Sequence, residues 1–364
     1  MLIHKREFLH AAIAFSSIAA LPSAAISATD TFDPRPVRWR KFELTTSVKI
    51  LNPAGNVRGW FPLAGFSAKD WNQPVSNTWR TNGIATEQAA GSYGVKLLMV
   101  DWSQASEQPY LEMISTVATR NRSSDLARRT GARLSPAEHA LYTAPTNLIP
   151  TDGIVKATSD KITVGAGDDV TKARRIYEWI IANTFRDPKV KGCGLGNIRY
   201  MLETGNMGGK CADINALFVG LTRAAGIPAR DLYGIRVAPS EFGYKSLGAN
   251  TTDVSKAQHC RAEIHLAGTG WIPVDPADVR KVVLEEPPGN LSIDDPKVAA
   301  AHKTLFGAWE GNWIAYNTGH DVALPDLKDD ALAFLMYPQA ENGGTLINCL
   351  DPASFQYGIT AREI

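Results

Sequence analysis

The 364-residue chain has few cysteines and no evident set of metal ligands. Only four cysteines are present, and no two of them form a CxxC pair. The seven histidines are scattered without the spacing that metal ligands show. Four thiols can supply one disulfide beside reactive or buried cysteines, but they cannot build a disulfide framework. We therefore expect no structural zinc site and no cofactor.

Blocks of like charge, low-complexity tracts and internal repeats are also absent from the sequence. It holds 38 basic and 37 acidic residues, of which Lys5, Arg6 and Glu7 lie in residues 1–28. Without that segment, 36 residues of each sign remain. A neutral chain has no electrostatic reason to bind nucleic acid or anionic lipid, and we expect neither as a partner.

Only one long apolar stretch is present, and it lies at the start of the chain. Residues 1–28 combine a basic beginning, a run of small apolar residues, and cleavage points that would leave Ile26 or Thr29 first. The run is too short and too broken for a membrane span, so we interpret it as a signal peptide. KREFLH resembles a twin-arginine signal with Lys5 in place of the first arginine, which leaves that route and the general secretory route open. We expect a periplasmic or secreted chain without membrane insertion.

Residues 29–122 are expected to be mainly β structure. In KFELTTSVKI, apolar residues alternate with more polar neighbours from Phe42 to Ile50, which is the period of a half-buried strand. NPAGN then predicts a turn, and VRGWFPL predicts the strand that returns beside the first. YGVKLLMVDW and PYLEMISTVATR predict two further strands. Strands at such short intervals indicate a sandwich-like N-terminal β domain, in which we find no chemical motif.

Residues 123–281 predict helices followed by strands. LSPAEHALY is typical of a short helix, and GDDVTKARRIYEWIIANT predicts a longer one that Asp168 or Asp169 caps. A third helix starts at Cys211. Its apolar residues recur at i, i+3, i+4 and i+7, which is the pattern of a buried face, and Gly226 ends it.

Cys211 stands in the first turn of that third helix, where unpaired backbone N–H groups and the helix dipole favour negative charge. Because the thiolate is the nucleophilic form of cysteine, a reactive thiol ionises readily at this position. Gly205, Gly208 and Gly209 come before it. They permit the backbone to approach a substrate and leave N–H groups for an oxyanion. A cysteine at a helix start can equally be an inert core thiol, so its partners must decide.

HCRAEIHLAGTGWIPVDP predicts a β-hairpin that opens with a histidine and closes with an aspartate. Strand alternation places His259 and Arg261 on the same face. If residues 267–269 form the loop, Asp275 pairs with Arg261 and lies diagonal to His259 on that face. A carboxylate there would hold the imidazole in the tautomer that deprotonates a thiol. Cys211, His259 and Asp275 therefore predict a catalytic triad.

GKCADINALFVGLTRAAGIPAR and HCRAEIHLAGTGWIPVDPADV together resemble the transglutaminase-like superfamily, a branch of the papain-like thiol fold, over roughly residues 168–281. The resemblance implies a bacterial exported member with an α+β core, in which the cysteine-bearing helix packs on an antiparallel sheet. It also implies that Cys211 is the nucleophile, His259 the base and Asp275 the orienting acid. Arg261 departs from the pattern, since many members carry an aromatic residue there.

Acyl transfer through a thioester is the chemistry that this resemblance implies. We expect an enzyme that hydrolyses amide bonds in a peptide or protein substrate. Two alternatives stay open: transfer to an amine, as in protein cross-linking, and a non-catalytic binding module that keeps the fold. The complete set of cysteine, histidine and aspartate argues against the binding module. Only the Cys211 N–H can be assigned as an oxyanion donor.

The other cysteines and the C-terminal segment have structural interpretations. We expect Cys260 to be a core thiol or a disulfide partner of Cys193, and Cys349 to be a structural thiol. Residues 282–364 predict a β-rich extension of the thiol domain that forms one wall of its cleft. Three of its aromatic residues are expected to pack against the sheet: Trp309, Trp313 and Tyr316.

Charged and amide residues near the two motifs are also expected to be structural. Arg261 and Glu263 flank His259 on its face, and we expect them to form a salt bridge rather than to bind substrate. Asp213 and Asn215 lie near the start of the cysteine-bearing helix. We expect caps or local hydrogen bonds from both, because short polar side chains near a helix start usually bond the backbone.

Overall fold

The computed structural model describes residues 32–103, 107–328, 331–353 and 355–364. They belong to one compact unit, Thr31–Ile364. The signal peptide predicted for residues 1–28 lies outside the described residues. Among the described helices, none has both the length and the hydrophobicity that a membrane span requires.

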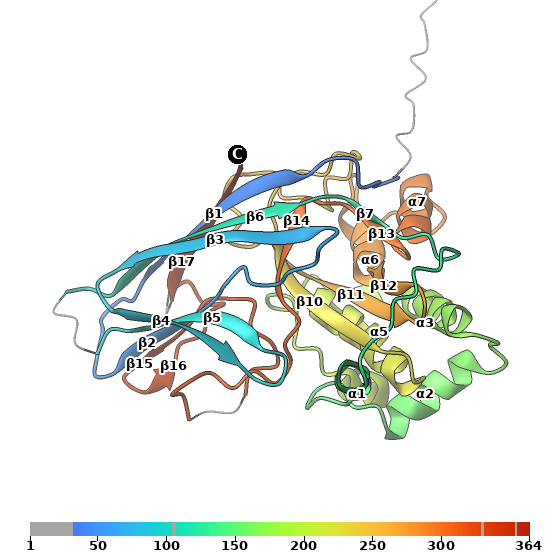
Figure 1. The fold of residues 1–364 in the computed structure, drawn as a ribbon, viewed down its shortest axis with the longest axis horizontal. Helices are drawn as coiled ribbons and strands as arrows, with labels where there is room; N and C mark the ends of the chain where they lie inside the picture. The colour runs from blue at the N-terminus through green and yellow to red at the C-terminus, as the bar shows by residue number, and fades with distance from the viewer. Residues whose placement is uncertain (1–31, 104–106, 329–330, 354) are drawn as a thin grey trace, which may run out of the picture. The chain divides into compact units, whose positions relative to one another are not determined.

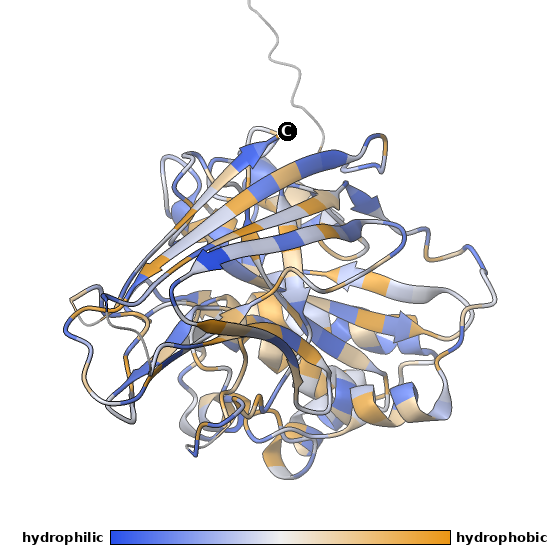
Figure 2. Cartoon of the chain, turned by 60° about the vertical axis from the view of Figure 1, so that its left-hand side comes forward, coloured by the Kyte–Doolittle hydropathy of each residue, from blue (hydrophilic) through white to orange (hydrophobic). Residues whose placement is uncertain are grey.

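Two antiparallel sheets contain the N-terminal strands (Figure 1). The first has the order β17-β1-β6-β3 and comprises β1 (Arg40–Lys49), β3 (Asn72–Thr81), β6 (Tyr110–Thr119) and β17 (Gln356–Glu363). The second has the order β16-β15-β2-β5-β4 and comprises β2 (Val57–Pro62), β4 (Ile84–Ala90), β5 (Val95–Asp101), β15 (Gln339–Asn342) and β16 (Thr345–Leu346). Buried residues alternate with more exposed ones along β1, and Figure 2 shows hydrophobic and hydrophilic residues alternating along strands of this kind.

An apolar core joins these two sheets. Val48 of β1 and Leu111 of β6 belong to the same buried cluster as Phe61 of β2 and Leu98 of β5. Since the first two strands belong to one sheet and the last two to the other, the apolar faces of the sheets pack together. Full burial of each such side chain contributes roughly 1.5–3 kcal/mol to folding. The predicted sandwich-like β domain is confirmed.

The predicted pairing of β1 with β2 is wrong. β1 pairs with β6 and β17, whereas β2 pairs with β5 and β15. The connection between them, residues 50–56, is longer than the loop of a tight hairpin. It carries the chain across the gap of about 10 Å that separates packed sheets.

The C-terminal segment supplies strands to both parts of the protein. β14 (Trp313–Asn317) pairs with β10 (Ala229–Arg236) of the thiol domain, and β13 (Ala308–Trp309) pairs with β7 (Arg122–Ser123). β15 and β17 instead pair with β2 and β1 of the β domain. Residues 282–364, which we predicted as an extension of the thiol domain alone, are therefore shared between the two parts. The aromatic residues predicted to pack inside this segment are buried: Trp309, Trp313 and Tyr316.

An antiparallel sheet of order β12-β11-β10-β14 forms the centre of the thiol domain. Its other strands are β11 (Gln258–Leu266) and β12 (Gly270–Val274). Helix α5 (Cys211–Ala224) packs on β10 and β11, and every residue of α5 except Asp213 is buried. The predicted α+β core, with the cysteine-bearing helix on an antiparallel sheet, is confirmed.

Further helices surround α5. They are α1 (Pro136–Thr143), α2 (Gly153–Thr163), α3 (Asp169–Asn183), α4 (Ile198–Thr204), α6 (Pro276–Glu285) and α7 (Pro296–Thr304). Two short strands, β8 (Phe185–Arg186) and β9 (Gly208–Gly209), pair in parallel. Ser135 and Glu138 form a capping box at the start of α1. Asp168 caps α3 by accepting a hydrogen bond from Thr171 N. The predicted starts of both helices are confirmed.

Candidate active site

Cys211 is the first residue of α5, and its side chain is buried. Asp213 fixes the chain that leads to it. The Oδ2 atom of Asp213 accepts a hydrogen bond from Lys210 N at 2.9 Å, and Oδ1 accepts from Leu195 N at 3.0 Å and Gly196 N at 2.9 Å. Asp213 therefore makes the local hydrogen bonds that we predicted, and it ties a preceding loop to the start of the helix.

The glycines near Cys211 make room for Asp213. A Cβ on Gly209 would clash with the Asp213 side chain, and a Cβ on Gly194 would clash with its carboxylate. Gly194 also has a φ of +92°, a conformation that favours glycine. Sequence analysis assigned the glycines before Cys211 to the approach of a substrate, whereas Gly209 serves the packing of an aspartate. Within the described part of the chain the Cys211 N–H bonds no acceptor, so it can donate to an oxyanion.

Strands β11 and β12 pair in the predicted register. Ala262 faces Val274, which brings Asp275 level with Arg261 and diagonal to His259. The Nε2 atom of His259 lies 2.8 Å from Oδ2 of Asp275. Both side chains are buried, and the contact between imidazole and carboxylate that we predicted from the hairpin is present.

Asp275 also caps α6. Its Oδ1 atom accepts a hydrogen bond from Asp278 N at 3.1 Å, so the contact with His259 and the helix cap occur together. Asn215 Nδ2, on α5, donates to the same oxygen at 3.2 Å and to Cys260 O at 2.8 Å. Asn215 is therefore not a cap of its own helix, because it fixes the carboxylate that contacts His259.

Sequence analysis missed a second carboxylate at the histidine. Asp278 Oδ1 lies 3.3 Å from His259 Nε2 and 2.5 Å from Arg236 Nη2. Burial raises the pKa of Asp278, but the charges of Arg236 and His259 outweigh burial and hold the pKa well below its ordinary value. The sequence contained a signal for this residue, because Asp278 follows Asp275 by three positions in the first turn of a helix.

The charged neighbours of His259 on β11 are buried in ion pairs. Glu263 contacts Arg122 of β7 and lies 2.6 Å from Arg230 of β10. Arg261 donates to Glu310 O at 2.9 Å, and its Nε lies 3.7 Å from Asp275 Oδ2. The structural interpretation of both residues is confirmed, although their partners lie on other elements.

Three cysteines meet at the start of α5. The sulfur atoms of Cys193, Cys211 and Cys260 all lie within 4.8 Å of one another, and all three residues are buried free thiols. We left a disulfide between Cys193 and Cys260 open, and the structure has both as thiols. Cys349 is half-buried outside this cluster, and its sulfur lies 3.4 Å from Gln339 Nε2.

Two groups of described side chains have donor atoms close enough to hold a metal ion. One is the thiol cluster, and the other is His259 with Asp275 and Asp278. In the second group the carboxylates already hold His259 and Arg236. A hydrogen-bonded network therefore accounts for this group without a metal.

The surroundings of Cys211 favour its thiolate. Burial raises the pKa of the Cys211 thiol. Hydrogen bonds from Cys193, Cys260 and His259 outweigh burial, and the pKa lies well below its ordinary value. The two neighbouring thiols have raised pKa values, so they keep their protons and can form S–H hydrogen bonds to the Cys211 sulfur. The Cys193 S–H has a second acceptor, Gln258 O, at 3.3 Å.

The surroundings of His259 favour its imidazolium. Burial and the charge of Arg236 lower the pKa of His259, but Asp278 and Asp275 raise it more, to about 9. Because Asp275 binds Nε2, the ring nitrogen available to the Cys211 sulfur is Nδ1. The lowered pKa of Cys211 and the raised pKa of His259 both favour a thiolate beside an imidazolium.

Cys193→Ala is expected to raise the pKa of Cys211. The variant removes one S–H donor, and a hydrogen bond to a charged group contributes roughly 1.5–3 kcal/mol, of which a weak thiol donor supplies the lower part. We therefore expect the pKa of Cys211 to rise in this variant. Alkylation of Cys211 by iodoacetamide, followed against pH, measures it. Cys349→Ala is the matched control. An equal pKa of Cys211 in both variants would show that the Cys193 thiol does not stabilise the Cys211 thiolate.

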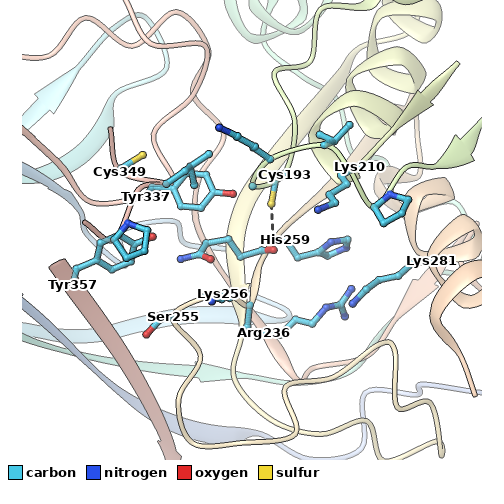
Figure 3. A pocket seen from close by; sticks show the side chains of 18 of the residues that line it. Cys193, Lys210, Arg236, Ser255, Lys256, His259, Lys281, Tyr337, Cys349 and Tyr357 are labelled. Atoms are coloured by element: carbon cyan, nitrogen blue, oxygen red, sulfur yellow. Dashed lines mark hydrogen bonds between the residues drawn. The ribbon is translucent and has the colours of Figure 1, made fainter. Parts of the chain in front are cut away.

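His259 lies at one end of a cleft of about 860 Å³ (Figure 3). In Figure 3, Tyr337, Cys349 and Tyr357 lie across the cleft from His259 and Lys210. The C-terminal segment thus forms one wall, as we predicted. The aromatic residues of that wall are not those that we singled out in the sequence.

Comparisons with known proteins agree with this fold. The family model of the transglutaminase-like superfamily matches residues 156–276, a range that contains Cys211, His259 and Asp275. An uncharacterized protein of Haemophilus influenzae is 38% identical over 345 residues, which cover 89% of this chain and 91% of the relative.

The solved structures that match this chain share little sequence with it. A candidate cysteine protease from Cytophaga hutchinsonii is 14% identical with a TM-score of 0.49, and the alignment covers 90% of this chain and 99% of that one. The periplasmic domain of TgpA from Pseudomonas aeruginosa is 15% identical with a TM-score of 0.36, over 67% of this chain and 88% of the domain. The family match, together with the cysteine-bearing helix and its antiparallel sheet, leads to one assignment: the chain carries a domain of the transglutaminase-like superfamily over residues 156–276.

Proposed function

We propose that this protein is an exported cysteine-dependent acyl-transfer enzyme that hydrolyses amide bonds in peptide or peptide-like substrates. The observation that supports the proposal is the 2.8 Å contact between His259 and Asp275 beside the Cys211 thiol. Each group has the ionisation that acyl transfer needs, and His259 lines a cleft that can admit a peptide.

In the first half of the proposed reaction the Cys211 thiolate attacks the carbonyl carbon of the scissile amide. A C–S bond forms, and the Cys211 N–H donates to the oxyanion. His259 then gives its Nδ1 proton to the leaving amine, the C–N bond breaks, and a thioester remains. Asp275 stabilises the imidazolium until the proton has left and keeps Nδ1 toward the sulfur.

In the second half, neutral His259 takes a proton from a water molecule. The resulting hydroxide attacks the thioester carbonyl, and Cys211 leaves as the thiolate while the acid is released. The cleft that His259 lines is the path by which a water molecule would reach the thioester. An amine that entered by the same path would instead form a new amide.

The acyl acceptor can be identified by mass analysis of products. The mature protein is incubated with a peptide library, with and without an added primary amine. Hydrolysis is expected to release peptides with a new carboxyl end even when the amine is present. A predominance of amine adducts would assign the protein to the transferases. If wild type and Cys211→Ala both gave no products, the binding-module alternative would replace the proposal.

Activity is expected to decline as pH rises through about 9. The reactive form needs His259 protonated to supply the leaving amine, and its pKa is raised to about 9, so this proton is lost above that pH. The acid limb lies well below the pH at which an ordinary cysteine ionises, because the pKa of Cys211 is lowered. A profile of kcat/KM against pH checks both limbs, with circular dichroism as the control for folding. Activity still rising beyond pH 9 would contradict the ion pair.

A further inference from the structure

The cleft beside His259 is lined by cations and by no carboxylate. Its described lining includes seven basic residues: Arg186, Lys189, Lys191, Lys210, Arg236, Lys256 and Lys281. No Asp or Glu is among the described residues that line it. The whole chain carries 38 basic and 37 acidic residues, so the bias is a property of the cleft rather than of the composition.

Three of these cations form ion pairs with two carboxylates behind the lining. Arg236 pairs with Asp278 at 2.5 Å. Arg186 contacts Glu285, and Lys281 Nζ lies 3.5 Å from the same carboxylate. These pairs fix the wall around His259 and offset part of the positive charge of these three side chains.

The other four, Lys189, Lys191, Lys210 and Lys256, form no ion pair with a described residue. Lys189 and Lys191 lie in the loop that leads to Cys193, and Lys210 directly precedes the nucleophile. Lys256 comes shortly before His259, and the exposed Asp253 near it accepts hydrogen bonds from Ser255 instead of forming an ion pair with Lys256. Free positive charge therefore flanks both segments that supply the reacting groups, and Figure 3 includes Lys210 and Lys256 in the lining.

Gln258 adds an unpaired donor to the same cleft. Its side chain is only 9% exposed, it lines the cleft, and its Nε2 has no hydrogen-bond partner among the described residues. A buried polar group without a partner costs roughly 1–3 kcal/mol, so a ligand oxygen at this point is favoured. The wall on the side of His259 thus presents hydrogen-bond donors and cations.

The C-terminal segment adds apolar residues to the lining. They include Leu350, Phe355 and Tyr357, and the rings of Tyr337 and Tyr357 lie across the cleft from His259 in Figure 3. Aromatic rings and a leucine side chain provide contact area for apolar side chains. A ligand that fits both walls carries acidic groups on one side and apolar groups on the other.

We infer that this cleft binds an acidic peptide, with its carboxylates at Lys189, Lys191, Lys210 and Lys256. The apolar residues of the peptide pack on the facing wall, and one of its acyl groups lies beside Cys211. An oligonucleotide would also satisfy the lysines, but it supplies no acyl group to the thiol. The inference rests on the proposed function for the bond that is cut, whereas the binding itself does not depend on catalysis.

Binding is measured on the Cys211→Ala chain, so that the readout does not require turnover. Three fluorescein-labelled peptides are alike except that their polar positions carry Glu, Gln or Lys. Anisotropy titrations are expected to give the tightest binding for the Glu peptide and the weakest for the Lys peptide. The difference should shrink at high ionic strength, because exposed charges are screened by salt.

Charge reversal on the cleft wall has a matched control elsewhere on the surface. Lys189→Glu with Lys191→Glu is expected to weaken binding of the Glu peptide about tenfold or more and to improve binding of the Lys peptide. Lys161→Glu with Lys303→Glu changes the net charge equally at exposed positions outside the cleft, and it is expected to leave both affinities unchanged.

Three results would overturn the inference. One is equal affinity for the Glu and Lys peptides, and another is an equal loss in the control variant. The third is tighter binding of an oligonucleotide of the same charge that displaces the Glu peptide. Turnover of peptides by the wild type without charge preference would leave the proposed function standing. Charge-selective binding without any turnover would instead overturn the proposed function alone.

Discussion

Cys211→Ala is expected to abolish turnover while the fold stays intact. Of the three thiols that meet at the start of α5, Cys211 is the one whose pKa is lowered, and removal of a nucleophile lowers rates by roughly 10⁴-fold or more. Alanine is the best helix former, so it fits the first position of α5. We therefore expect the free energy of unfolding to fall by only about 1 kcal/mol. Initial rates together with thermal denaturation check both parts.

Alkylation provides the control for this variant. In the wild type at neutral pH, iodoacetamide is expected to label Cys211 before the other cysteines, because its pKa is lowered. Cys193 and Cys260 are buried with raised pKa values, and Cys349 also has a raised pKa. Cys349→Ala keeps the Cys211 sulfur and should retain turnover. The assignment is wrong if another cysteine reacts first and Cys211→Ala retains turnover.

The local parts of the site could be predicted from the sequence. The contact between His259 and Asp275 depends on a three-residue loop and on strand alternation, and both are properties of a short continuous segment. The position of Cys211 at a helix start likewise follows from the glycines before it and the apolar period after it. A short-range pattern of this kind is compatible with few other local structures.

The parts that depend on packing between distant segments could not be predicted. Asn215 reaches Asp275 only because α5 lies across the sheet, and Cys193 meets Cys211 through a loop whose path no local pattern specifies. The pairing of β17 with β1 joins opposite ends of the chain, which no short-range signal encodes.

Strands β3 and β4 escaped prediction for a different reason. Each lies at the edge of its sheet, and most of their residues are exposed or only partly buried. Polar residues are common on edge strands, where they discourage pairing with other chains. The apolar alternation that identified β1 is therefore weak in both strands, and their sequences resemble polar loops.

Asp275→Asn is expected to lower kcat/KM by about 10²- to 10⁴-fold without loss of the fold. The variant keeps the shape of the side chain, and two hydrogen-bond donors fix the orientation of its amide group. Asp278 N and Asn215 Nδ2 both donate to the Oδ1 position, so the amide oxygen stays there and the NH₂ group faces His259 Nε2. The ring must then accept at Nε2 and carry its proton on Nδ1, and in that tautomer it cannot take the proton of the thiol.

The free energy of unfolding should change little in this variant. A loss of rate without a loss of stability then distinguishes the role of Asp275 in catalysis from its role as a helix cap. Burial and the charge of Asp278 raise the pKa of Asp275, so the folded protein gains little from ionising this carboxyl, and an uncharged amide can replace it. Asp168→Asn, at the cap of α3, is the matched control, because it makes the same substitution at a helix start far from the cleft. Rates and melting temperatures of the two variants are compared with the wild type. If Asp275→Asn is as active as Asp168→Asn, Asp275 serves only to cap α6, and His259 must obtain its tautomer from Asp278 instead.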